Sequence, residues 1–305
     1  ALRVALWAAG LAACGGAAPP DGRPSGVDMS QGTGSGSPDM SGGASTACSL
    51  TANTSPTAKT NPAGCAVQQR DASACAAARQ AAGLSGVWLK FSCRVTLSAA
   101  TENGAAVIRA QSDGQPDHLS NYFPKTNACW ESYTGSIQNP NQIAVNSATV
   151  SFPQVPNTTA RSMMGVAVVG LALNGVAIFG NFAAPGDDIY FEAMTFDRCG
   201  AHPENTGRYH YHGEPYSLSY DDGNLIGVMR DGAPIYGRRD MDGSLPMVDQ
   251  YGGHTGATAD SAAPVYHYHL TQQTSTSPRT AGQKQWFLTT GMFRGSIGAC
   301  TGSGC

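Results

Sequence analysis

The chain has 305 residues, enough for one large domain or two small ones with a sizeable core. Only 13% of the residues are charged, the formal net charge is -3, and no stretch is rich in Lys or Arg. Because phosphate binding requires clustered cations, these numbers argue against a nucleic-acid partner.

The first fourteen residues have the pattern of an export signal. Arg3 supplies a positive charge, and an apolar run too short to span a bilayer as a helix ends just before Cys14. Small residues before a cysteine are typical of a lipobox, whereas a plain secretory signal is the alternative. Gly15, rather than Asp, follows the cysteine, which favours an outer membrane. We therefore expect a signal peptide over residues 1–14 and an exported protein, anchored at the outer membrane or cell surface through lipidated Cys14.

Two further segments precede the main domain. Residues 15–47 are rich in Gly, Ser and Pro and contain almost no large apolar side chain, so we expect a disordered tether. Residues 48–83 contain three cysteines and an Ala-rich helix pattern over residues 66–82 that stops at Gly83. This segment is predicted to be a small helical cap stapled by disulfides.

The cysteine count agrees with export. The chain contains nine cysteines, and an even number remains once Cys14 is set aside for lipidation. An even number in an exported chain predicts disulfides, and no Cys-x-x-Cys pair points to a zinc or thioredoxin-type site. The spacing leaves the connectivity open.

The rest of the chain has a β pattern. From Val87 onward, short apolar runs alternate with Gly and Pro, which is typical of strands. The most apolar stretch, residues 165–182, contains the hairpin turn signal Asn174-Gly175 and predicts two buried strands rather than a membrane helix. We expect a mainly β domain over residues 84–305 with a sandwich- or barrel-like core.

The second half of the chain contains an internal duplication. Three segments occur twice in the same order: residues 173–180 and 230–237, residues 196–202 and 248–254, and the tetrapeptide Tyr-His-Tyr-His at 209–212 and 266–269. Six of the seven histidines fall in these units. A duplicated unit predicts two lobes related by a pseudo-twofold axis.

Each tetrapeptide places two histidines for chelation. Residues i and i+2 of a strand face the same side about 6.5–7 Å apart, so each histidine pair can bind one ion. A histidine from the upstream Gly-rich loop can supply a third ligand. Three histidines with an open position form the usual catalytic zinc geometry, and imidazole equally suits copper, iron and nickel. Alternatively, both pairs converge on one shared four-histidine site. The candidate ligands are His202, His210, His212, His254, His267 and His269.

Other side chains of the repeat suggest supporting roles. Asp197 and Asp249 precede the loop histidines at equivalent positions, and we expect each carboxylate to fix the tautomer of a ligand by accepting its second N–H. The tyrosines are expected on the opposite face, in the core. A hydrogen-bonded His-Tyr-Asp core, or proton-transfer chemistry without a metal, is the alternative to metal binding.

These motifs resemble the YHYH-domain proteins, a family of exported proteins named for the tetrapeptide. The resemblance spans roughly residues 84–305. It rests on residues 113–118 (DGQPDH), 173–180, 207–212, 231–237 and 252–269. It implies that His118 also sits in a family motif, which makes it a further candidate ligand. The family's biochemical role is largely unassigned, and the first copy departs from the second with Ala201 in place of Gly253.

Two function classes fit the sequence. The first is an exported lipoprotein that binds a transition metal for storage, delivery or sensing, with copper favoured over zinc because of compartment, histidine content and the nearby Met194, Met229 and Met241. The second is a metal-dependent extracellular enzyme, oxidative or hydrolytic, that acts on a small molecule at an open coordination position. A non-catalytic structural or adhesion module is a further alternative.

Overall fold

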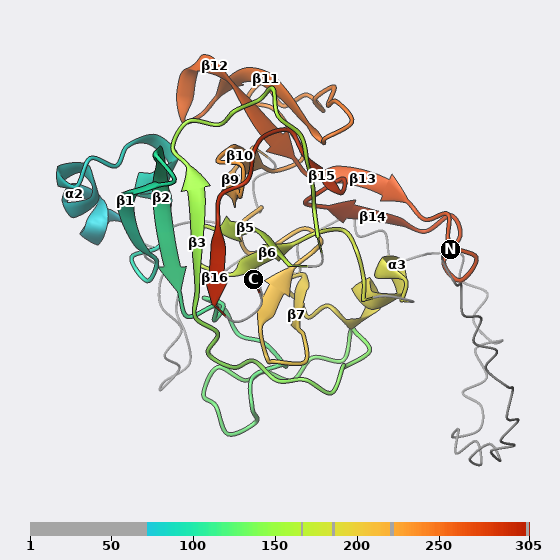
Figure 1. Ribbon diagram of the computed structural model, residues 1–305. Helices are drawn as coiled ribbons and strands as arrows, with labels where there is room; N and C mark the ends of the chain where they lie inside the picture. Colours follow the sequence, from blue (N-terminus) through green and yellow to red (C-terminus); the bar gives the residue numbers. More distant parts are fainter. Residues whose placement is uncertain (1–71, 166, 185–186, 220–222, 303–304) are drawn as a thin grey trace, which may run out of the picture. The chain divides into compact units, whose positions relative to one another are not determined.

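A computed structural model describes residues 72–165, 167–184, 187–219, 223–302 and 305, all within one unit, Asp39–Cys305 (Figure 1). The expected signal peptide, the lipidated Cys14, the tether and most of the cap lie outside the described residues. Within the described part, none of the helices is both long enough and apolar enough to cross a membrane.

The described part of the cap is helical and stapled, as predicted. Helix α2 (Ser73–Ala81) is followed by Gly83, which has a φ of 82°. A disulfide joins Cys75 of this helix to Cys93, and the buried Arg79 donates to backbone carbonyls of the segment 91–95. These contacts hold the helix and the short 3-10 helix η1 (Gly86–Lys90) against the chain that leads into the first strand.

The predicted disulfide chemistry is confirmed in the described part of the chain. Cys300 pairs with Cys305, and Cys129 and Cys199 are also disulfide-bonded. Together with Cys75 and Cys93, every cysteine among the described residues is therefore in a disulfide. Such a composition is typical of a protein that folds in an oxidising compartment.

The mainly β architecture is also confirmed, with two principal sheets. The smaller sheet is antiparallel in the order β1-β2-β3-β16. Its strands are β1 (Thr96–Glu102), β2 (Ala105–Ser112), β3 (Ala148–Pro153) and β16 (Cys300–Gly302). Buried side chains from both principal sheets join one hydrophobic core, including Ile108, Phe152, Val169 and Ile226. This shared core agrees with a sandwich-like arrangement.

The larger sheet has eight strands in the order β11-β12-β10-β9-β5-β6-β8-β7. The first copy supplies β5 (Val168–Ala172), β6 (Ala177–Phe179), β7 (Ala201–Pro203) and β8 (Tyr209–Tyr211). The second supplies β9 (Leu225–Met229), β10 (Pro234–Tyr236), β11 (Gly253–Thr258) and β12 (Ser261–His269). The central strands β5 and β9 are wholly buried, which explains their continuous apolar sequences.

The strand order reads the same outward from the centre, because the two copies are related by a pseudo-twofold axis. Leu171 pairs with Val228, its equivalent in the other copy, so the axis passes between these residues of β5 and β9. Each copy then adds one parallel strand, in which Ile178 pairs with Tyr211 and Ile235 with Tyr268. The two-lobe arrangement predicted from the repeat is therefore present, and it places the two Tyr-His-Tyr-His segments toward opposite ends of the sheet.

Short elements complete the described part. Helix α3 (Ile189–Glu192) and 3-10 helix η2 (Ala193–Thr195) lie between β6 and β7 in the sequence. Two small antiparallel pairs join β13 (Thr271–Thr274) to β14 (Lys284–Phe287), and β4 (Ser162–Met163) to β15 (Met292–Phe293).

Candidate metal centres

The first copy gathers three buried histidines. His210 and His212 follow one face of β8, and the antiparallel strand β7 places His202 directly opposite His210. The Nε2 atoms of His210 and His212 lie 2.9 Å apart, and one ring nitrogen from each of the three residues lies within 4.8 Å of the others. At most 3% of each side chain is exposed. We name these three residues the first site.

The second copy repeats this arrangement and adds a carboxylate. His254 of β11 lies opposite His267 of β12, and His269 follows two residues later. Asp240 Oδ1 lies 3.2 Å from His254 Nε2, 3.4 Å from His269 Nε2 and 3.6 Å from His267 Nε2. These four residues, which we name the second site, also have ligand atoms within 4.8 Å of one another.

The structure therefore brings the six repeat histidines together as two groups of three rather than one shared cluster. Sequence reasoning missed Asp240. Extending the alignment of the repeat by three residues beyond Gly180 and Gly237 aligns Asp240 with Ala183. That difference between the copies was the available signal, although only the fold shows that the carboxylate reaches the histidines.

Backbone carbonyls fix the tautomers of the paired histidines. The Nδ1 contacts are His210 with Arg208 O at 3.0 Å, His212 with Gly180 O at 2.5 Å, His267 with Val265 O at 3.0 Å, and His269 with Gly237 O at 2.8 Å. A carbonyl oxygen can only accept, so each Nδ1 carries the hydrogen and each Nε2 presents a lone pair in the neutral ring. The same carbonyl positions serve in both copies.

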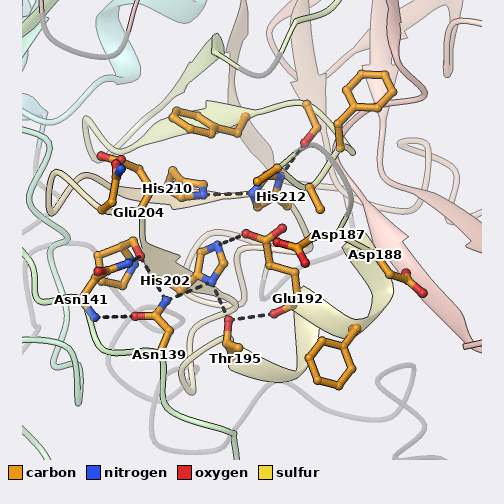
Figure 2. A pocket seen from close by; sticks show the side chains of 18 of the residues that line it. Asn139, Asn141, Asp187, Asp188, Glu192, Thr195, His202, Glu204, His210 and His212 are labelled. Atoms are coloured by element: carbon orange, nitrogen blue, oxygen red, sulfur yellow. Dashed lines mark hydrogen bonds and ion pairs between the residues drawn. The ribbon is translucent and has the colours of Figure 1, made fainter. Parts of the chain in front are cut away.

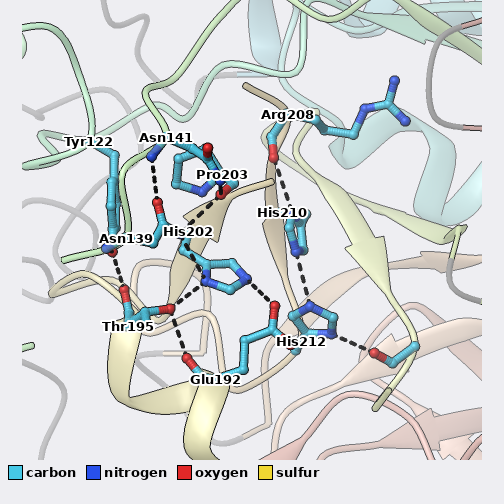
Figure 3. Close-up of polar contacts among 11 residues, drawn as sticks. Tyr122, Asn139, Asn141, Glu192, Thr195, His202, Pro203, Arg208, His210 and His212 are labelled. Carbon is cyan, nitrogen blue, oxygen red and sulfur yellow. Dashed lines mark hydrogen bonds and ion pairs between the residues drawn. The ribbon is translucent and has the colours of Figure 1, made fainter. Parts of the chain in front are cut away.

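The Thr195 hydroxyl contacts the third histidine of the first site, His202. Its Nδ1 lies 2.6 Å from Thr195 Oγ1, and that hydroxyl donates at 2.8 Å to the carbonyl of Glu192 (Figure 3). The hydroxyl oxygen is therefore free to accept the Nδ1 hydrogen of the tautomer that would present the Nε2 lone pair to a metal. Among the described residues this buried Nε2 has no hydrogen-bond partner, although Glu192 Oε1 lies 3.3 Å away.

Burial favours the neutral form of the paired histidines, whose Nε2 atoms face one another. Burial lowers the pKa of His210 well below its usual value, and burial together with nearby His202 lowers the pKa of His212 to about 4. In the second site, burial likewise lowers the pKa of His267 and brings that of His269 to about 4. Neutral imidazoles whose lone pairs converge repel one another unless a cation lies between them, and neutral imidazole is the form that ligates metals.

The two predicted aspartates have a different role from the one expected. Asp197 accepts from the Tyr209 hydroxyl at 2.7 Å and from the Cys199 amide at 2.9 Å. Asp249 likewise accepts from the Tyr266 hydroxyl at 3.0 Å and from the Tyr251 amide at 2.8 Å. Each carboxylate thus shapes the turn that presents the loop histidine and anchors a tyrosine, rather than bonding to an imidazole.

The tyrosines and His118 lie on the opposite side of β8 and β12 from the two sites. The Tyr211 hydroxyl accepts from Asn174 at 3.1 Å, and the Tyr268 hydroxyl donates to Asp231 at 2.5 Å. His118 is buried, and its Nε2 lies 3.3 Å from the Tyr211 hydroxyl. The structure does not bring His118 into either group of candidate ligands.

The two sites differ in their surroundings. A cavity of about 570 Å³ borders all three histidines of the first site, as Figure 2 shows. Beside the second site there is a hollow of only about 10 Å³, bordered by Asp240, His267 and His269. As bounded by the described residues, the cavity at the first site therefore has room for a small molecule, whereas the hollow at the second does not.

A positive-φ glycine shapes the turn before each loop histidine, and substitution of the first is expected to be costly. Gly200 has a φ of 89°, and an added Cβ would lie 2.2 Å from the backbone oxygen of Glu214. We expect Gly200→Ala to destabilise the chain by more than the roughly 1–2 kcal/mol of left-handed strain alone. Thermal denaturation should compare it with Gly104→Ala, because Gly104 has a similar φ of 79° with open space around it. Equal losses from the two variants would contradict the steric argument.

The fold and site define the class of this protein as a duplicated β-sheet protein with paired histidine clusters. A family model described as YHYH protein matches residues 147–245, so the chain carries a domain of the YHYH family. The match contains the first site and extends to Asp240. No curated protein and no solved structure matches the chain.

Proposed function

We propose that the protein is an exported lipoprotein that binds two transition-metal ions, one at each site. The observation that carries the proposal is the convergence of Nε2 atoms, 2.9 Å apart for His210 and His212 and 3.2 Å apart for His254 and His269. At metal–nitrogen distances of about 2.0–2.1 Å, both separations allow one ion to bind two imidazoles. The Nδ1 atoms of the four tetrapeptide histidines are already held by backbone carbonyls, as is usual for metal-ligating histidines.

Copper is favoured over zinc. Imidazole suits both metals, and copper(II) binds a given nitrogen site more tightly in the Irving–Williams order. At the first site, the separation of 2.9 Å between two nitrogens corresponds to an angle of about 90° at the metal, which suits tetragonal copper(II) better than tetrahedral zinc, whereas the 3.2 Å separation at the second site corresponds to about 103° and does not discriminate. The methionines differ in position: Met229 is buried in the core, whereas Met241 borders the hollow beside the second site together with Asp240.

Export is supported by the disulfides of every described cysteine, because such bonds form and persist outside the cytosol. Lipidation at Cys14 remains a prediction from the sequence. Mass spectrometry of the protein purified from a bacterial membrane fraction tests it, since a lipidated Cys14 would begin the mature chain. A mature chain that is cleaved elsewhere and carries no lipid would contradict the anchor.

Metal content is the direct test of the proposal. The purified chain, incubated with excess copper(II) or zinc and dialysed, is expected to retain two equivalents by elemental analysis. Binding to the folded state alone should raise its stability by about 2.7 kcal/mol for each site at a free-metal concentration 100 times the Kd, visible as a higher Tm. One equivalent would contradict two separate sites, and none would instead favour a structural module.

The cavity at the first site favours a second candidate function, a metal-dependent extracellular enzyme. Catalytic metal sites commonly combine three protein ligands with a position open to water or substrate, whereas structural sites are closed. The three histidines of the first site and the adjoining space of about 570 Å³ have this form. A screen of the copper- and zinc-loaded chain with oxidisable and hydrolysable small substrates would test this function.

A further inference from the structure

We propose that the two sites have diverged, so that Asp240 completes the second while the first binds a small uncharged ligand at an open coordination position. The inference rests on the proposed metal binding and extends it by assigning different roles to the two ions. The second ion would be held by four protein groups. The first would be held by three and would accept its fourth donor from a molecule in the cavity.

The divergence centres on one pair of equivalent positions. Asp240 lies three residues after Gly237, whose carbonyl holds His269, and Ala183 lies three residues after Gly180, whose carbonyl holds His212. The carboxylate of Asp240 reaches all three histidines of the second site. Ala183 has no ligand atom and instead lines the cavity. The carboxylate nearest the first site, that of Glu192, contacts His202 but does not lie within 4.8 Å of all three histidine ligand atoms, so the first site lacks a counterpart of Asp240.

The second site is closed by its ligands rather than by burial. The side chains of His254 and Asp240 are each 22% exposed, so water reaches them, but the adjoining hollow of about 10 Å³ is too small for an organic ligand. The first site is more deeply buried, and its cavity extends to the exposed residues Phe182 and Asp187. A ligand can thus enter from solvent and reach the buried histidines.

Two buried polar atoms at the first site lack partners among the described residues. They are Nε2 of His202 and Oε2 of Glu192. The Glu192 side chain lies beside His202 and borders the same cavity (Figure 2). An unpaired buried oxygen acceptor is costly, and a ligand with an N–H or O–H group would satisfy it. The site therefore favours a molecule that has a hydrogen-bond donor besides its metal-binding lone pair.

The cavity walls favour an uncharged ligand with an apolar part. Three phenylalanines, Phe179, Phe182 and Phe191, line the cavity together with four carboxylate residues, Asp187, Asp188, Glu192 and Glu204. The described lining includes neither Arg nor Lys. These carboxylates oppose the charge of the proposed ion and therefore weaken its attraction for an anion. Imidazole, with one lone-pair nitrogen, one N–H and a flat apolar ring, is a suitable probe.

The test uses the full chain loaded with copper(II) and titrated with imidazole, followed by visible absorption and electron paramagnetic resonance. Imidazole is expected to change the spectrum of one of the two ions. That change should survive in His267→Ala/His269→Ala and disappear in His210→Ala/His212→Ala. A response that depends on the second site, or no response with two ions bound, would overturn the inference while leaving metal binding intact. A chain without metal would instead refute the proposed function.

Substitutions at the equivalent positions 183 and 240 provide a matched pair of variants. Ala183→Asp should weaken imidazole binding at the first site at least tenfold, because the new carboxylate can take the open position. Asp240→Ala should retain the second ion more weakly and give it an imidazole response that the wild type lacks. Asp242→Asn, two residues away on the surface, serves as the control and should change neither titration. Unchanged imidazole binding in Ala183→Asp, with the variant folded, would overturn the assignment of the open position.

A separate experiment tests whether the wall carboxylates disfavour anions at the first site. Neutralising two wall carboxylates in Asp187→Asn/Glu204→Gln should strengthen binding of the anion azide to the first ion severalfold, and by a larger factor than it changes imidazole binding. Equal azide affinities in the variant and the wild type would overturn the proposed preference for uncharged ligands.

Discussion

Replacing His210 and His212 together by alanine is expected to reduce bound copper from two equivalents to one. The two residues supply two of the three convergent Nε2 atoms of the first site, and a single remaining His202 cannot chelate. The second site shares no ligand with the first, so its ion should remain. Elemental analysis after dialysis, together with the copper spectrum of the residual ion, measures the result.

The reciprocal variant gives the decisive control. His267→Ala/His269→Ala should also retain one equivalent, with the spectrum of the first site rather than the second. His118→Asn removes a buried histidine that lies outside both sites and should retain two equivalents. Circular dichroism verifies that each variant is folded, and His210→Gln/His212→Gln, with a smaller loss of volume, replaces the alanine variant if it is not. Loss of both ions from either pair would show that the sites depend on each other.

The apoprotein is expected to lose stability as the pH falls below about 6.5, the ordinary value for histidine. Burial holds the pKa of His212 and of His269 at about 4 in the folded chain. Between these values the unfolded chain binds more protons than the folded chain, so acidification favours unfolding. The stabilisation is complete above pH 6.5 and is lost progressively toward pH 4. For each residue the loss at pH 5 amounts to about 2 kcal/mol.

Urea denaturation of the metal-free chain at pH 7.5 and pH 5 measures this effect. A loss of about 4 kcal/mol is expected for the two residues together, which is a large share of the stability of a typical domain. The variant His212→Gln/His269→Gln lacks two of the four histidines whose pKa burial lowers, so its loss should be smaller by about 4 kcal/mol than that of the wild type, while His210 and His267 still titrate. Equal stability of the wild-type apoprotein at the two pH values would contradict the assigned burial of neutral imidazoles.

The sequence predicts local features well because they follow from short-range geometry. Strand alternation alone places His210 and His212 on one face and the tyrosines on the other, as the structure confirms. The hairpin signal at Asn174-Gly175 and the duplication together predict the two-lobe sheet. The resemblance to the YHYH family, drawn from the same motifs, is confirmed over residues 147–245.

The partners of each histidine could not be predicted in the same way, because they come from distant segments. Asp197 was expected to bond to an imidazole, but it holds Tyr209 and a turn. The carbonyls of Gly180 and Gly237 each accept from a histidine that lies 32 residues later in the chain, on or directly after a neighbouring parallel strand. Only the register of those strands selects these acceptors, and a one-residue shift would turn each histidine to the other face.

The sequence by itself thus determined that the candidate ligands are histidines and that the chain contains two sets of them. It also determined that the two histidines of each tetrapeptide share a face, because side chains two residues apart in a strand point to the same side. Only the tertiary structure decided that there are two sites, that Asp240 belongs to one of them and that a cavity adjoins the other. Because the pseudo-twofold axis passes between Leu171 and Val228 at the centre of the sheet, the two tetrapeptides lie toward its opposite ends. The separation of the sites, and their different surroundings, follow from that long-range strand order.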